Sequence, residues 1–147
     1  ELFNKIKSKI PQAILRTTVM VGFPGETDKD IDNLIDFINK IEFDHLGAFS
    51  YSREEDTPSY DYPNQIDKSI KAERLDKVMK LQQKISYNLN KKHLNEVMEG
   101  VVTNVNNGTY ELRSYFNAPD DIDGEVIITN NGYNKDIIGK IKEVCQA

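Results

Sequence analysis

The residues best placed to do chemistry lie in two short stretches, each at the end of an apolar run. The first is Arg16-Thr-Thr-Val-Met-Val-Gly-Phe-Pro-Gly-Glu-Thr27, in which β-branched residues lead into a Gly-Pro-Gly loop and then a helix start. A loop at the carboxyl end of a parallel strand can offer free backbone N–H groups to a ligand. The second, Tyr51-Ser-Arg-Glu54, groups a phenol, a guanidinium and a carboxylate that could position a protein substrate.

Each of these residues also has a structural explanation. The strand residues could simply pack, and Gly22 and Gly25 are needed for tight turns in either case. Glu26 could cap the helix that follows it, and the charges after Tyr51 could belong to a solvated loop. His45 and His93 stand without metal-ligand spacing, so no metal site is predicted.

Regular elements must position the two stretches. We expect a helix over 2–10, a strand over 13–22, a helix from Thr27 with a capping box completed by Asp30, and a strand over 45–51. A strand, a helix and a strand with short connections form a βαβ unit, which makes the two strands parallel. The middle helix has one apolar stripe, formed by Ile31, Leu34, Ile35, Ile38 and Ile41.

The rest of the chain divides into a loop, a long helix and a β-rich tail. The loop over 52–66 is long enough to suggest a function. The helix over 67–93 carries apolar positions that include Ile70, Val78, Met79 and Ile85. Beyond it, short β-rich runs are separated by Asn-Gly turns, which predicts a small antiparallel barrel of about five strands, similar to OB folds.

These motifs carry a family resemblance. The Gly-Phe-Pro-Gly-Glu-Thr block, with Arg16-Thr-Thr before it and Tyr51-Ser-Arg-Glu-Glu-Asp-Thr-Pro58 after it, resembles the last two barrel strands of radical S-adenosylmethionine methylthiotransferases. The tail resembles the TRAM domain of that family. Ser-Arg-Glu-Glu, Arg113-Ser-Tyr, Ala118-Pro and Asp123-Gly124 are similar to the branch that methylthiolates an aspartate of small-subunit ribosomal protein S twelve.

The resemblance implies a fold class and a domain division. Residues 1–66 would be the C-terminal part of an α/β, TIM-like radical SAM barrel, and 67–93 a connecting helix. Residues 94–147 would form the all-β antiparallel TRAM barrel. The chain would then be a segment of a longer enzyme.

The resemblance also implies cofactors and site residues. The full-length enzyme would hold S-adenosylmethionine and two 4Fe-4S clusters, but Cys145 matches no cluster ligand, so this segment alone should be inactive and supplies no catalytic residue. Which face of the first strand lines the cofactor stays open. The implied cofactor-binding residues are Arg16, Thr18, Val19, Val21, Gly22 and Glu26. The implied substrate-binding residues are Tyr51, Arg53, Glu54, Arg113, Asp120, Asp121 and Asp123.

Charge favours one partner over another. From Leu94 onward nine acids face four bases, a balance of −5 that equals the net charge of the whole chain. An acidic domain would repel an RNA backbone, whereas a basic ribosomal protein complements it. Ribosomal protein S twelve is therefore the preferred partner. A tRNA methylthiotransferase and a non-catalytic binding module are the alternatives.

Composition agrees with a cytoplasmic setting. A single cysteine excludes an internal disulfide framework, and no apolar run reaches the roughly 20 residues of a membrane helix. We expect neither a membrane nor a DNA partner.

Overall fold

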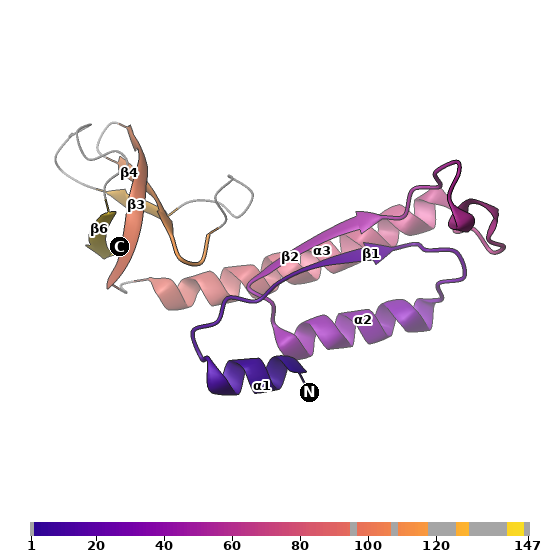
Figure 1. The fold of residues 1–147 in the computed structure, drawn as a ribbon, viewed down its shortest axis with the longest axis horizontal. Coiled ribbons are helices and arrows are strands. Elements are labelled where there is room, and N and C mark those ends of the chain that lie inside the picture. Colours follow the sequence, from indigo (N-terminus) through magenta and orange to yellow (C-terminus); the bar gives the residue numbers. More distant parts are fainter. Residues whose placement is uncertain (1, 95–96, 107–108, 118–125, 130–140, 146–147) are drawn as a thin grey trace. The chain divides into compact units, whose positions relative to one another are not determined.

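The computed structural model describes residues 2–94, 97–106, 109–117, 126–129 and 141–145 (Figure 1). The chain divides into two compact units, Glu1–Asn88 and Leu89–Ala147. The first contains α1 (Leu2–Lys9), β1 (Arg16–Val21), α2 (Asp28–Ile41), β2 (His45–Ser50), a 3₁₀ turn η1 (Pro58–Asp61) and most of α3 (Lys68–Asn90).

The predicted βαβ unit is confirmed. Strands β1 and β2 pair in parallel, with Thr18 opposite Gly47. Strand β1 begins at Arg16 and not at Ala13, so it is shorter than predicted. Just before it, the backbone N–H of Leu15 donates to the Asp44 carboxylate, 2.8 Å away, and not to a neighbouring strand.

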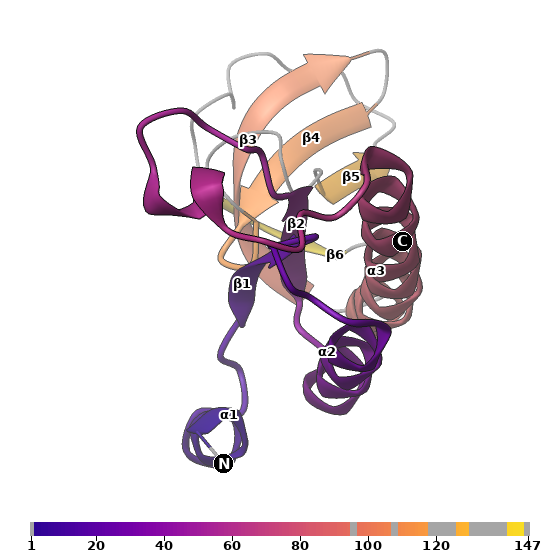
Figure 2. The same ribbon diagram turned by 90° about the vertical axis from the view of Figure 1, so that its right-hand side faces the viewer.

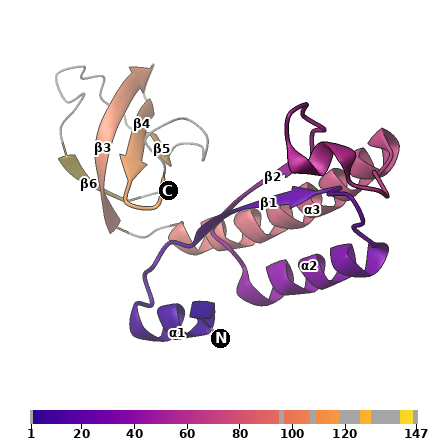
Figure 3. The same cartoon turned by 45° about the vertical axis from the view of Figure 1, so that its right-hand side comes forward.

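Helices cover one face of this two-stranded sheet. Along β1 more exposed and less exposed side chains alternate, and the last residue of the strand, Val21, is fully buried. Figure 2 shows α2 and α3 on the same side of β1 and β2, and α3 runs alongside both strands (Figure 3). The opposite face remains open and carries Met20 and Phe49, which are neighbours in the register and are both exposed.

Helix α2 begins with the predicted capping box. The Thr27 hydroxyl accepts a hydrogen bond from the N–H of Asp30, and the Asp30 carboxylate accepts one from the N–H of Thr27. Both satisfy backbone donors that the first turn of a helix leaves free. The predicted stripe faces the core, where Ile31, Ile38 and Ile41 are buried; Leu34 and Ile35 lie half-buried at its margin.

The buried face of α3 differs from its predicted apolar stripe. Ile70 and Met79 are exposed, whereas Arg74 and Gln82 are buried. Burial of polar groups requires partners. Gln82 donates its amide to the carbonyl of Phe43, and Arg74 forms two ion pairs; among the described residues, Gln82 Oε1 and Arg74 Nε have no hydrogen-bond partner. Hydrophobic periodicity correctly placed Val78 and Ile85 on the buried face. It missed Arg74 and Gln82, because these two residues are buried through polar contacts.

The second unit is an antiparallel sheet in the order β5-β4-β3-β6. Its strands are β3 (Val97–Asn106), β4 (Thr109–Ser114), β5 (Val126–Thr129) and β6 (Ile141–Cys145). A bulge between Val102 and Asn104 shifts the pairing of β3 with β4. The buried side chains described in this unit form one apolar cluster, which contains Val102, Val105, Tyr110, Leu112 and Val126. The turns predicted at Asn106-Gly108 and Asn130-Gly132 reach into segments outside the described residues.

Among the described residues, none of the helices combines the length and apolar character needed to cross a membrane.

Candidate functional site

The loop between β1 and α2 lies at the carboxyl end of the parallel strands. Gly22 and Gly25 both have positive φ, 76° and 86°. Residues with a Cβ rarely adopt this backbone conformation. The loop is tied at Gly25, whose N–H donates to the carbonyl of Asn64 at 3.0 Å. The glycine prediction is confirmed for backbone conformation at both positions.

Glu26 closes this loop. Its Oε1 accepts the backbone N–H of Gly22 at 2.7 Å and pairs with Nη1 of Arg74 at 2.8 Å. Arg74 also reaches Oδ1 of Asp28 at 2.7 Å, in the first turn of α2. The capping prediction for Glu26 is therefore replaced by another structural role: Thr27 and Asp30 cap the helix, while Glu26 joins the loop to α3.

Two groups here have perturbed pKa values. Burial opposes the charged form of Arg74, but the hydrogen bonds it donates to Asp28 and Glu26 outweigh that effect and raise its pKa. The hydrogen bonds from the hydroxyl and N–H of Thr27 lower the pKa of Asp30. Arg74 is thus a permanent cation at the loop.

The exit of β2 is built around Tyr51. Its side chain is buried, with its ring 5.1 Å from that of Phe23 in an edge-to-face arrangement. Nζ of Lys71 lies 4.9 Å from the Tyr51 ring centroid and donates to the Tyr51 carbonyl at 2.9 Å. Among the described residues, no group forms a hydrogen bond with the Tyr51 hydroxyl. The predicted rim residue is therefore part of the core, with an unsatisfied hydroxyl.

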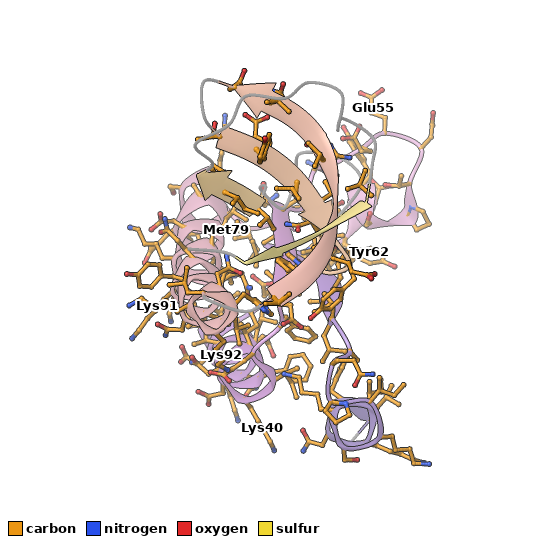
Figure 4. The ribbon with its side chains drawn as sticks, turned by 90° about the vertical axis from the view of Figure 1, so that its left-hand side faces the viewer. Lys40, Glu55, Tyr62, Met79, Lys91 and Lys92 are labelled. Carbon is orange, nitrogen blue, oxygen red and sulfur yellow. The ribbon has the colours of Figure 1, made fainter. Side chains whose placement is uncertain are left out.

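Arg53 and Glu54 lie on the exposed loop that follows. Nε of Arg53 donates a hydrogen bond to the carbonyl of Tyr60 at 2.7 Å. The Arg53 guanidinium stacks on the Tyr60 ring, 4.1 Å from its centroid. The Glu54 side chain is exposed. In Figure 4 this loop also presents Glu55 and Tyr62. The tethered Arg53 and the exposed Glu54 do not form a common site with buried Tyr51.

The structure separates the six predicted cofactor residues by face. Arg16 and Thr18 lie on the open face of β1, whereas Val19 and Val21 alternate onto the face covered by helices. Gly22 and Glu26 belong to the loop. The structure thus shows which face of β1 the helices leave open, while the cofactor-binding role of these residues stays a prediction.

The remaining predicted substrate residues lie in the second unit. Arg113 is in β4, paired with Val101 and on the face opposite to Leu112. Asp120, Asp121 and Asp123 lie outside the described residues.

Sequence reasoning missed Lys71 and Arg74. Both lie on one side of α3 at a spacing of three residues, and both reach loops that follow a strand. The available signal was that Arg74 and Gln82 share their helical face with Val78, a buried apolar residue.

The described residues contain no group of three or more His, Cys, Asp or Glu side chains arranged to hold a metal ion.

The first unit is thus an α/β element with a glycine loop at the carboxyl edge of its parallel strands, and the second is a small antiparallel sheet. No family model matches the chain. Ribosomal protein uS12 methylthiotransferase RimO from Fervidobacterium nodosum is 46% identical over 142 residues, which is 97% of this chain and 32% of that protein. The same-named protein from Petrotoga mobilis is 42% identical over 98% of this chain and 32% of its own length.

RimO from Clostridioides difficile is 54% identical over 99 residues, which is 67% of this chain and 22% of the relative. The chain belongs to the RimO methylthiotransferase family and matches the C-terminal part of these proteins. It spans about a third of the length of the relatives that match nearly all of it.

Proposed function

We propose that this chain is part of an enzyme that methylthiolates ribosomal protein uS12. The observation that carries the proposal is the 42–46% identity to proteins named uS12 methylthiotransferase along nearly the whole chain. In this proposal β1, α2 and β2 belong to a radical SAM barrel, and the second unit is a TRAM domain. The parallel pairing of β1 with β2 and the antiparallel order of the second sheet support these assignments.

The open face of the β1–β2 sheet fits part of a cofactor site. It combines the hydroxyl of Thr18 with the exposed apolar side chains of Met20 and Phe49. Gly47 leaves space beside Thr18, because a Cβ there would be 3.8 Å from Thr18 Oγ1. Such a surface is chemically suited to S-adenosylmethionine, whose aromatic adenine ring can pack on apolar side chains and whose ribose hydroxyls form hydrogen bonds. Arg16, on the same face, adds a positive charge for its carboxylate.

The chain does not fit the ligand set of an iron–sulfur cluster. Clusters require several thiolates, and the chain has one cysteine. In the full-length enzyme, S-adenosylmethionine bound to such a cluster would supply the radical chemistry for methylthiolation at the β-carbon of the aspartate. The residues of this chain would bind and orient, and the thiolates would come from elsewhere in the enzyme.

Charge supports uS12 over tRNA as the substrate. From Leu94 onward the chain has nine acids against four bases, and the whole second unit, which begins at Leu89 and adds Lys91 and Lys92, has nine against six. Phosphate binding depends on Lys and Arg, so an acidic domain lacks the main source of RNA affinity. A basic protein substrate would be attracted by a domain with a net negative charge.

The test is an assay of the full-length enzyme, reconstituted anaerobically, on uS12 and tRNA side by side. We expect methylthiolation of uS12 and none of tRNA. Modification of tRNA alone would overturn the proposed substrate, and modification of neither would contradict the proposed activity.

The cofactor face has its own test. Gly47→Val should fill the space beside Thr18 and lower the affinity of the full-length enzyme for S-adenosylmethionine, measured by equilibrium dialysis. Thr18→Val keeps the shape of the side chain and removes only its hydroxyl, so its effect should be smaller. Wild-type affinity in both variants would exclude this face from the site.

A further inference from the structure

Helix α3 contacts the segments that follow both parallel strands. Lys71 donates to the carbonyl of Tyr51 just after β2, at 2.9 Å. One turn further along, Arg74 binds the carboxylate of Glu26 after β1, at 2.8 Å, and its carbonyl at 3.3 Å. Because residues three apart share a helix face, one side of α3 holds both loops at once.

The contact with the first loop is specific in shape as well as in charge. The stem of Lys71 packs directly on Gly22, where a Cβ would collide with Lys71 Cγ. The Gly22 N–H is in turn held by Glu26, at 2.7 Å. The backbone from Gly22 to Glu26 is thus fixed at both ends by α3, through Lys71 at one and Arg74 at the other.

Helix packing alone does not require this arrangement. Arg74 is only 8% exposed and the Glu26 side chain 13%. Removing such charges from water is costly, and apolar residues of similar size often pack as well or better. Lys77 and Asp32 join α3 to α2 by an ion pair of 3.0 Å that stays on the surface and touches no loop. The buried pair differs in that it acts on the loop itself.

We propose that Lys71 and Arg74 are positioning residues, which hold the Gly22–Glu26 loop and the exit of β2 in one fixed geometry at the edge that receives the cofactor. This inference rests on the proposed function, which places the cofactor on the open face of the β1–β2 sheet, next to the edge where the two strands end. Groups held rigidly before binding lose less entropy when the ligand arrives. Lys71 and Arg74 need not touch the cofactor to affect its affinity.

The experiment compares Arg74→Met with Lys77→Met in the full-length protein. Arg74→Met removes the ion pairs with Glu26 and Asp28, and Lys77→Met removes the ion pair with Asp32. Only the Arg74→Met variant loses a contact with the loop. Hydrogen–deuterium exchange of the peptide containing Gly22 is the direct readout. We expect exchange roughly tenfold faster in Arg74→Met, as for loss of a charge-assisted hydrogen bond, and unchanged in Lys77→Met.

Affinity for S-adenosylmethionine, from equilibrium dialysis, is the second readout. It should fall roughly tenfold in Arg74→Met and not in Lys77→Met, and Arg74→Lys should restore part of it because an ammonium can still pair with Glu26. Should Arg74→Met fail to fold, Lys71→Met keeps an apolar stem beside Gly22 and removes the contacts of the ammonium with the carbonyl and the ring of Tyr51. It should speed exchange at the exit of β2.

Two outcomes separate this inference from the proposed function. Cofactor affinity and loop exchange that are equal in Arg74→Met and Lys77→Met would overturn the positioning role while leaving the proposed function intact. A wild-type protein that binds no S-adenosylmethionine, but whose loop loosens in Arg74→Met, would overturn the cofactor assignment and support the fixed loop.

Discussion

The two units are stabilised in different ways around their functional candidates. At the edge of the β1–β2 sheet, buried charges of α3 hold a glycine loop. In the second unit the described core is an apolar cluster on one face of an antiparallel sheet. The difference indicates that apolar packing can stabilise a sheet, whereas a loop of defined shape requires directional contacts. Hydrogen bonds and ion pairs depend on geometry, and apolar burial does not.

The largest expected effect tests the apolar part of the first unit. Phe43 is fully buried and its ring meets those of Phe3 and Phe37. Phe43→Ala should lower the free energy of unfolding by about 3–5 kcal/mol, measured by urea denaturation. Phe37→Ala, at a ring that is 40% exposed, is the control. An equal loss in both variants would show that burial does not set the cost.

The next test applies the same change to the second unit. Leu112 is fully buried in β4, and Leu112→Ala should cost about 2–5 kcal/mol by leaving a cavity. Ile127, on the neighbouring strand, is 58% exposed, and Ile127→Ala should stay within about 0.5 kcal/mol. Hydrogen exchange of the β3 and β4 amides measures the loss. If the two variants behave alike, the apolar cluster is not the core of this unit.

A smaller loss of stability is expected at the start of α2, which is stabilised by a hydrogen bond and not by apolar packing. Thr27→Ala removes the hydroxyl that accepts the Asp30 N–H and should cost about 1 kcal/mol. Thr27→Ser keeps the hydroxyl and should remain near wild type. Thermal unfolding compares them, and equal melting temperatures for Ala and Ser would contradict a role for the capping box.

The smallest effect is a pH dependence at the same cap. The hydrogen bonds from Thr27 lower the pKa of Asp30 in the folded state. The folded state therefore binds fewer protons here than the unfolded chain, so this contribution is complete above the unfolded pKa of about 4 and is lost as pH falls through the folded value. Asp30→Asn should reduce the loss of melting temperature between neutral and acid pH. Asp36→Asn, exposed on the same helix, is the control, and a larger change in the control would refute this assignment.

Much of the local architecture was predictable because it depends on neighbours in sequence. The capping box of Thr27 and Asp30, the stripe of α2 and the turn glycines all follow from contacts within a few residues. The family resemblance was also readable from contiguous motifs, and relatives confirm it. The site was less predictable. Tyr51 stands beside charged residues at the end of a strand, which predicted a position at the rim, but its side chain is buried.

The sequence by itself determined the βαβ order, the positions of the glycine turns and the excess of acid in the tail. The tertiary structure decided which face of β1 stays open, and that Arg74 and Lys71 hold the two loops. Alternation along a strand is the same whichever side is covered, and only the packed helices break that symmetry. The pairing of Arg74 with Glu26 joins positions 48 residues apart, and no local periodicity encodes such a contact.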